Sequence, residues 1–388
     1  MTDIFKNNVV LITCGRGLVP YLKKEVAALG YDIISEHNTG IEVRASLVDT
    51  MLFNLSLRTA SHVMCLIKNF SCRNVDRLYS EVKSLPWEEL IDTCEYLSVV
   101  AVADTTYLKN SMFAAQKVKD AVVDRIMKAK GARPLSGPKR DNVVISIFWK
   151  DDKCWLYIDT TGEKLSNRGY RKIPHTAPLR ENLAAGLLIA SGYDGKHAFV
   201  NPMCGSGTLA IEAALIALNR RPGLLRNNYG IKHIKGFDKN EWETLRGKFK
   251  KESLKKLSAP IIAADIDEKA IAAARQNALT AGVSELIEFH VCDFSDTPVP
   301  ENESVIMLNP EYGVRLNDSD EIGALYKGIG DFFKQKCAGS TGYVFTGNFK
   351  AAKQIRLKPS RRLEFFNAKI ECRLLEYRLY SGSQRSCV

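Results

Sequence analysis

The stretch HAFVNPMCGSGTLAIEAALIAL, residues 197–218, decides how the second half of this 388-residue chain folds. Residues 197–201 predict a buried strand, and residues 208–219 predict a strongly apolar helix. The loop between them, residues 202–207, contains Gly205 and Gly207, which permit tight turning and a close approach of the backbone to a ligand. Ligands of open α/β sheets bind at the carboxyl ends of strands, so this loop predicts a ligand site.

Strands and helices alternate on both sides of this stretch. The further predicted strands are 261–265, 286–291, 304–308 and 342–347, and the further predicted helices are 183–191, 268–281 and 321–336. This alternation predicts a parallel, doubly wound α/β sheet. Two last strands at 363–368 and 372–380, separated by a short turn, predict an antiparallel hairpin at the edge of that sheet.

Residues 1–160 show a different pattern, in which strands return on each other as hairpins. The predicted strands are 9–14, 31–35, 41–45, 97–103, 143–149 and 154–159, and the predicted helices are 17–29, 46–57, 74–83 and 111–129. This mixture predicts an α+β region. The boundary to the second half falls in the polar and basic segment 160–182.

The composition is that of an ordinary globular protein, with 45% hydrophobic and 26% charged residues. No apolar run reaches the roughly 18 residues of a membrane span, and the N-terminus lacks the features of a signal peptide. We therefore expect a soluble, cytoplasmic protein. The ten cysteines include no C-x2-C pair and the six histidines have no metal-ligand spacing, so reduced thiols and no metal site are expected.

The net charge of +11 is concentrated in the second half of the chain. Residues 1–160 carry 21 Lys and Arg against 19 Asp and Glu, whereas residues 161–388 carry 34 against 25. Residues 219–260 hold 12 basic and 4 acidic side chains, and residues 350–362 hold 6 basic and no acidic ones. Such runs can be solvated helix faces, but two basic tracts with a pI near 9.1 favour a polyanionic partner.

Two acidic residues follow later strands of the predicted sheet. Asp265 ends the strand IIAAD, where its carboxylate can accept hydrogen bonds from both ribose hydroxyls. Asp293 follows the strand that ends at 291 and could accept a hydrogen bond from an adenine amine. Either residue could also be an ordinary cap. Together with the glycine loop they predict an adenosine pocket that needs no pyrophosphate, because the loop lacks the third glycine of the dinucleotide fingerprint.

An Asn-Pro turn follows the strand predicted at 304–308. Asn309 and the carbonyl of Pro310 can accept the two hydrogens of an exocyclic base amine, so that its delocalised lone pair can point at a methyl sulfonium. The ring of Tyr312 can stack on the base. This arrangement predicts methyl transfer to the amine without a covalent intermediate.

At these residues the chain resembles the THUMP-domain RNA methyltransferases, and among them the bacterial guanine-N2 methyltransferases of 23S ribosomal RNA with a single methyltransferase domain. The matching motifs are RGYR (168–171), APLREN (177–182), NPMCGSGTLAIEAA (201–214), AADID (263–267) and NPEYGVRL (309–316). The resemblance implies three parts: a ferredoxin-like piece (1–43), a THUMP domain (44–160) that holds RNA, and a class I methyltransferase domain (161–388) that uses S-adenosylmethionine (SAM).

The resemblance also implies the site residues. The cofactor-binding set is Asn201, Cys204, Gly205, Gly207, Thr208, Asp265, Ile266, Asp293, Phe294 and Asn309, and the catalytic set is Asn309, Pro310 and Tyr312. Cys204 is expected to be a packing residue rather than a nucleophile. The family usually has N-P-P-Y where this chain has Glu311, but the acceptors Asn309 and Pro310 are present.

Several alternatives stay open from the sequence. The substrate could be transfer RNA, or the chain could bind RNA without catalysis. A DNA adenine methyltransferase also uses an N-P-P-Y turn, but residues 1–160 would then have no role. A nicotinamide-dependent oxidoreductase would need a pyrophosphate loop that this chain supplies only in part.

Overall fold

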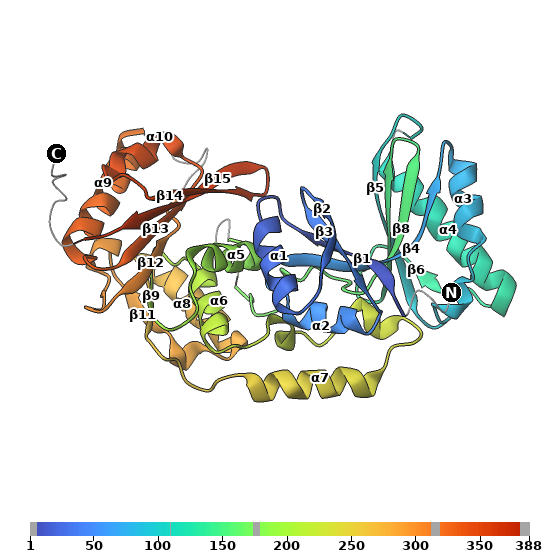
Figure 1. The fold of residues 1–388 in the computed structure, drawn as a ribbon, viewed down its shortest axis with the longest axis horizontal. Coiled ribbons are helices and arrows are strands. Elements are labelled where there is room, and N and C mark those ends of the chain that lie inside the picture. The colour runs from blue at the N-terminus through green and yellow to red at the C-terminus, as the bar shows by residue number, and fades with distance from the viewer. Residues whose placement is uncertain (1–5, 109, 174–178, 312–318, 381–388) are drawn as a thin grey trace. The chain divides into compact units, whose positions relative to one another are not determined.

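The computed structural model describes residues 6–108, 110–173, 179–311 and 319–380, which form two compact units (Figure 1). Unit 1 comprises Met1–Cys14, Leu22–Ser166 and Pro222–Phe249. Unit 2 comprises Gly15–Tyr21, Asn167–Arg221 and Lys250–Val388. Each unit contains its own sheet, so the two predicted halves of the chain correspond to two separate architectures.

Unit 1 is built on an eight-stranded sheet with the order β2-β3-β1-β4-β8-β7-β5-β6. Its strands are β1 (Asn8–Cys14), β2 (Ile33–His37), β3 (Gly40–Ala45), β4 (Ala60–Ser71), β5 (Tyr96–Asp104), β6 (Leu135–Ser136), β7 (Val143–Lys150) and β8 (Lys153–Asp159). The first four strands pair antiparallel. Because α1 (Val19–Ala28) and α2 (Asp49–Ser56) connect them along the chain, they form a ferredoxin-like arrangement.

The second part of the unit 1 sheet combines parallel and antiparallel pairs. β5 lies parallel to β6 and β7, whereas β7 and β8 form an antiparallel hairpin. Helices α3 (Val75–Lys83) and α4 (Ser111–Lys130) pack against each other, and α4 packs on β5. Asn74 and Asn110 cap these two helices by accepting hydrogen bonds from backbone N–H groups, which is why the helices begin where the sequence predicts.

The middle of the first basic tract, residues 222–249, packs within unit 1. It contains short 3-10 turns at Pro222–Leu225 and Gly230–His233 and most of helix α7 (Lys239–Glu252). Trp242 of α7 is fully buried with its ring 5.2 Å from that of Tyr229. The backbone at Gly223 lies so close to Leu55 of α2 that an added Cβ would be 2.5 Å from its Cα.

Unit 2 contains a seven-stranded sheet with the order β11-β10-β9-β12-β13-β15-β14. Its strands are β9 (Ala198–Pro202), β10 (Ile261–Asp265), β11 (Glu288–Val291), β12 (Ser304–Leu308), β13 (Thr341–Thr346), β14 (Arg361–Asn367) and β15 (Ile370–Arg378). The strands from β11 to β13 are parallel, and β15 is antiparallel to both β13 and β14. The predicted class I methyltransferase sheet with a C-terminal antiparallel hairpin is therefore confirmed.

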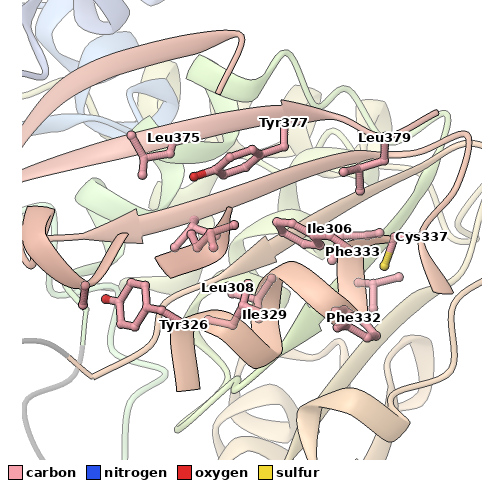
Figure 2. Close-up of a cluster of buried hydrophobic side chains, with 14 of the residues drawn as sticks. Ile306, Leu308, Tyr326, Ile329, Phe332, Phe333, Cys337, Leu375, Tyr377 and Leu379 are labelled. Carbon is pink, nitrogen blue, oxygen red and sulfur yellow. The ribbon is translucent and has the colours of Figure 1, made fainter. Parts of the chain in front are cut away.

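The helices of unit 2 are α5 (Glu181–Ser191), α6 (Thr208–Ala217), α8 (Glu268–Ala281), α9 (Ser319–Lys336) and α10 (Phe349–Ala352). A large hydrophobic cluster joins α9 to the sheet (Figure 2). In this cluster Tyr326, Ile329 and Phe333 of α9 pack with side chains of β12, β13 and β15. Burial of these side chains fixes the end of β12, where the Asn-Pro turn begins.

Candidate active site

Four neighbouring strands of unit 2 bring predicted site residues to one edge of the sheet. Asn201 lies near the end of β9 and Asp265 ends β10, while Asp293 follows β11 and Asn309 follows β12. These four strands are parallel and adjacent. Their carboxyl ends therefore meet at the edge where α/β proteins of this kind bind ligands.

The glycine loop between β9 and α6 has the tight backbone that its sequence predicts. Met203, Gly205 and Gly207 all have positive φ angles, of 62°, 53° and 82°. A Cβ at Gly207 would lie 2.9 Å from the Cβ of Ala274, so glycine is needed there for the approach of α8. A Cβ at Gly205 would meet no described atom within 4 Å, so open space lies beside this backbone.

Asp265 holds the glycine loop and keeps its carboxylate at the edge of the sheet. Its Oδ2 accepts a hydrogen bond from the N–H of Gly205 at 2.8 Å, and its Oδ1 accepts one from the N–H of Asp267 at 3.1 Å. Each carboxylate oxygen has a further lone pair, so the side chain can still accept ribose hydroxyls. The next residue, Ile266, has 71% of its surface exposed and offers an apolar face at the same edge.

Asp293 acts as a cap in this structure. Its Oδ1 accepts hydrogen bonds from the N–H and the hydroxyl of Ser295, at 2.9 and 2.6 Å, at the start of a short 3-10 turn. The ring of Phe294 packs against that of Phe332 at 6.1 Å. A cavity of about 460 Å³ opens between this turn and α9. Its described lining shares only Asp293 and Phe294 with the predicted cofactor set, so this cavity is not the whole predicted pocket.

The Asn-Pro turn presents an acceptor whose hydrogen-bonding capacity is not used by the described residues. The Oδ1 atom of Asn309 is buried and has no hydrogen-bond partner among the described residues. Pro310 is buried and Glu311 is exposed. Tyr312, the third predicted catalytic residue, lies outside the described residues.

Asn201 is fully buried and links two strands below this turn. Its Nδ2 donates a hydrogen bond to the carbonyl of Met307 in β12 at 2.8 Å. Its Oδ1 is buried without a hydrogen-bond partner in the described part of the chain. The side chain therefore aligns the glycine loop strand with the strand that leads to Asn309.

Cys204 is not activated as a nucleophile. Burial, together with the negative charge of Asp265, raises the pKa of its thiol well above the ordinary value. Its backbone N–H donates a hydrogen bond to the carbonyl of Ala264 at 2.8 Å, which ties the loop to β10. These observations agree with the prediction of a packing residue.

Arg171 connects the glycine loop to α5, and the sequence alone assigns it no role. Its guanidinium donates hydrogen bonds to the hydroxyls of Ser206 and Thr208, both at 3.0 Å. It also binds the carboxylate of Glu181 at 3.1 Å and the carbonyl of Leu179 at 2.9 Å. One side chain thus fixes both residues that flank Gly207.

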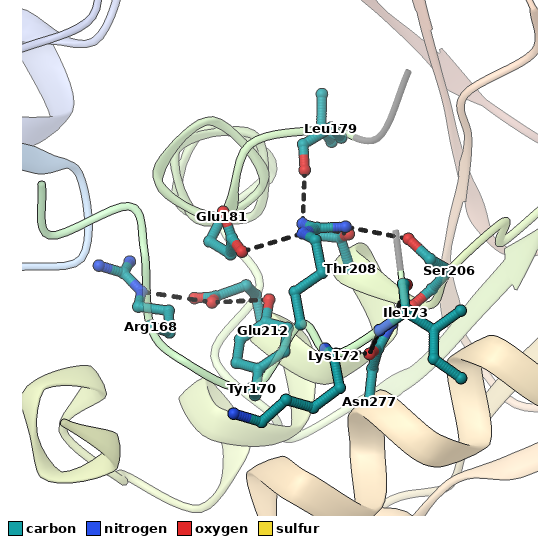
Figure 3. A network of polar contacts seen from close by, with 11 residues as sticks. Arg168, Tyr170, Lys172, Ile173, Leu179, Glu181, Ser206, Thr208, Glu212 and Asn277 are labelled. Carbon is teal, nitrogen blue, oxygen red and sulfur yellow. Dashed lines mark hydrogen bonds and ion pairs between the residues drawn. The ribbon is translucent and has the colours of Figure 1, made fainter. Parts of the chain in front are cut away.

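The same motif contains a buried ion pair. The side chains of Arg168 and Glu212 are 1% and 0% exposed and 3.5 Å apart, and the hydroxyl of Tyr170 donates to Glu212 at 3.2 Å (Figure 3). Burial and the charge of Glu212 raise the pKa of Tyr170 well above its ordinary value. One sequence signal could have revealed this pair: Glu212 is the single charge in the apolar helix TLAIEAALIA, and a buried charge needs a partner.

The two basic tracts differ in how their side chains are used. In the first, Arg226 donates to the carbonyls of Glu163 and Lys164, and Arg246 donates to the carbonyl of Arg226. The hydrogen bonds of Arg226 and Arg246 to backbone carbonyls therefore stabilise unit 1. In the second tract all six basic side chains are exposed.

Within the described residues, no helix is both long and apolar enough to cross a membrane. The same part of the chain contains no group of three or more His, Cys, Asp or Glu side chains placed to hold a metal ion.

The fold and the edge site of unit 2 define a class I methyltransferase domain, a class whose methyl donor is SAM. Three family models match the chain: "RlmL ferredoxin-like domain" at residues 10–64, "THUMP domain" at 72–159 and "RMKL-like, methyltransferase domain" at 168–376. The chain belongs to the family of RMKL-like methyltransferase domains, here preceded by ferredoxin-like and THUMP domains.

Comparisons with individual proteins agree with this assignment. The ribosomal RNA large subunit methyltransferase K/L of Syntrophotalea carbinolica is 36% identical over 375 residues, which are 94% of this chain and 53% of that protein. The chain therefore spans about half the length of this relative. A protein crystallised in complex with SAH is 25% identical with a TM-score of 0.87, covering 97% of this chain and all of that one. A protein of Listeria monocytogenes, described as a predicted N6-adenine-specific DNA methylase, is 29% identical with a TM-score of 0.84, covering 96% and 97%.

Proposed function

We propose that this chain transfers a methyl group from SAM to the exocyclic N2 amine of a guanine in 23S ribosomal RNA, in the cytoplasm. The observation that carries the proposal is the buried Oδ1 of Asn309, an acceptor without a partner among the described residues at the edge of the cofactor site. An unused buried acceptor is costly to a protein, so its retention suits a donor that arrives with the substrate.

The residues at the sheet edge fit SAM. Open space beside Gly205 leaves room for a ligand close to the backbone, and the carboxylate of Asp265 keeps free lone pairs for ribose hydroxyls. Exposed Ile266 and half-buried Phe294 offer apolar surfaces for an adenine ring. When bound, SAM supplies a methyl group on a positively charged sulfur.

The Asn-Pro turn prepares the amine. The Oδ1 of Asn309 accepts one hydrogen of the amine and the carbonyl of Pro310 accepts the other. Both hydrogen bonds draw the lone pair out of conjugation with the ring and hold the nitrogen in one orientation. Proline also removes an N–H donor that would compete at this position.

The choice of ribosomal RNA rests on family membership and on charge. The Syntrophotalea carbinolica relative, which matches 94% of this chain, is a large subunit ribosomal RNA methyltransferase, and the chain has a THUMP domain and a net charge of +11. Phosphate groups of RNA are the natural partner of such a charge.

The test is methyl transfer by the purified chain, with labelled SAM and 23S ribosomal RNA that lacks the modification. We expect N2-methylguanine in the digested RNA. Asn309→Ala should lower turnover by at least about a hundredfold, as expected when an interaction worth roughly 3 kcal/mol in the transition state is lost. SAM affinity should change little.

Asn302→Ala is the matched control, because Asn302 is an exposed asparagine just before the opposite end of the same strand β12. Its turnover should equal that of the parent chain. Full activity of Asn309→Ala would refute the acceptor role. N6-methyladenine as the product, or methylation of transfer RNA in preference to ribosomal RNA, would refute the proposed substrate, and SAM binding without turnover would indicate an inactive relative.

A further inference from the structure

The second basic tract presents its cations from a rigid support. Lys350, Lys353 and Arg356 are exposed, whereas Ala351 and Ile355 between them are buried in the hydrophobic cluster of α9. We call these three cations the α10 basic patch. The alternation of buried and exposed positions fixes the backbone and leaves the charges in solvent.

The turn after α10 packs closely against α9. A Cβ added to Gly330 of α9 would lie 2.0 Å from the carbonyl oxygen of Ile355. This close approach seats the turn Lys353–Ile355 directly on the helix. The patch therefore has a defined position on unit 2.

That position is next to the site. β13 lies parallel to β12, with Val344 opposite Leu308, so the carboxyl end of β13 meets the edge where Asn309 follows β12. α10 begins at Phe349, three residues after β13 ends. Arg373, opposite Thr346 in the sheet, places its guanidinium 4.5 Å from the ring of Phe349 and adds a cation beside α10.

Another group of exposed lysines in unit 2 provides a comparison. Lys251, Lys255 and Lys256 are exposed and precede β10, so the last two lead into the amino end of that strand. In a parallel sheet the amino ends are at the edge away from the ligand site. Of these two groups of cations, only the α10 basic patch therefore follows the carboxyl end of a strand.

The charges of the α10 basic patch are not neutralised within the described chain. None of its three cations forms an ion pair there, whereas nearby Arg361 is bound by Glu376, with Nε to Oε2 at 2.7 Å. Exposed cations without partners, on a rigid surface beside a nucleotide site, suit the phosphates of a bound strand.

We infer that Lys350, Lys353 and Arg356 bind backbone phosphates of the RNA strand next to the target guanine. This inference rests on the proposed function, because it assigns the strand that this site would methylate. Phosphate contacts fix the position and direction of a strand and carry no sequence information. The patch would hold the strand in register while the target base enters the pocket.

The test compares two triple variants of the full chain. One is Lys350→Gln, Lys353→Gln, Arg356→Gln, and its control is Lys251→Gln, Lys255→Gln, Lys256→Gln, which removes the same charge. Binding of an unmodified 23S ribosomal RNA transcript is measured over a range of salt concentrations. For three phosphate contacts we expect the Kd of the α10 variant to rise about a hundredfold near 0.1 M salt, and its salt slope to flatten by about 2.

The control should keep the parent salt slope. SAM affinity, measured by calorimetry, should be unchanged in both variants, which shows that the fold is intact. Equal Kd values and slopes for the two variants would overturn the inference. Binding does not require turnover, so this result is independent of whether the parent chain forms N2-methylguanine, which tests the proposed function.

Discussion

Arg171 donates hydrogen bonds to Ser206, Thr208, Glu181 and the carbonyl of Leu179. A lysine has a single ammonium group and cannot span these partners. We therefore predict that Arg171→Lys raises the Kd and the KM for SAM about tenfold, corresponding to the loss of one charged hydrogen bond. The kcat at saturating SAM should stay close to the parent value, because Arg171 acts through the loop.

The control for this prediction is Arg275→Lys. Arg275 is an exposed arginine of α8 that binds the carbonyl of Phe289 and contacts its ring. The Arg275→Lys variant should leave SAM binding unchanged. If both lysine variants bind SAM equally well in calorimetry, Arg171 does not position the loop.

The Arg168–Glu212 pair allows a second residue-scale prediction. Because both side chains are fully buried, removing one partner leaves an uncompensated charge, and Arg168→Met should lower the free energy of unfolding by about 3–5 kcal/mol. Arg168→Met combined with Glu212→Leu should recover most of this loss. Urea denaturation measures the free energy of unfolding of the single and the double variant.

The control is Lys196→Met, which breaks the exposed pair with Asp194 and should change the free energy of unfolding little. A loss equal to that of Arg168→Met would contradict the prediction.

The sequence predicts which residues reach the sheet edge, but not where their side chains point. Strand order alone predicts that Asp265, Asp293 and Asn309 lie at this edge. The direction of the Asn201 amide toward Met307 depends on packing between strands that are distant in sequence. Arg171 was missed for the same reason, because its partners lie up to 37 residues away.

At the scale of elements, the contact of α9 with the turn after α10 depends on one glycine. Gly330→Ala should destabilise the chain by about 1–3 kcal/mol, because the new methyl group would overlap the carbonyl of Ile355. Gly323→Ala in the same helix meets no described atom within 4 Å and should be neutral or stabilise by up to about 1 kcal/mol. Urea denaturation of both variants is the measurement, and equal effects would show that the backbones can separate at no cost.

The predicted elements are all present close to their predicted bounds, because each has a clear periodicity and recognisable ends. Strand β4 was missed, since its sequence ASHVMCLIKNFS lacks strict alternation and it follows α2 after only three residues. The sequence indicates helix α7 only as part of a basic tract. That residues 222–249 pack in unit 1 could not be predicted, because it depends on contacts with Leu55 and Leu90 far away in sequence. The proposed domain boundaries at 43 and 160 stay predictions.

At the scale of the whole molecule, the distribution of tryptophans separates the two units. All four, Trp87, Trp149, Trp155 and Trp242, lie in unit 1, and three of them are buried. All proposed cofactor residues lie in unit 2. Tryptophan fluorescence therefore reports the unfolding of unit 1, whereas far-UV circular dichroism reports both units.

A ligand that binds only the folded state stabilises the part of the molecule that contains its site. At about 100 times its Kd, SAM should stabilise unit 2 by about 2.7 kcal/mol, which corresponds to a rise of roughly 5–10 °C in Tm. Because unit 1 has its own sheet and core, we expect the circular dichroism transition to shift upward while the tryptophan transition shifts by less than half as much. Asn309→Ala should keep this difference, because the proposed function uses its Oδ1 for the base amine, whereas Asp265 and the glycine loop remain to bind SAM. Equal shifts of both signals would show that the units unfold as one cooperative body, and the separate sheets would then not be separate units of stability.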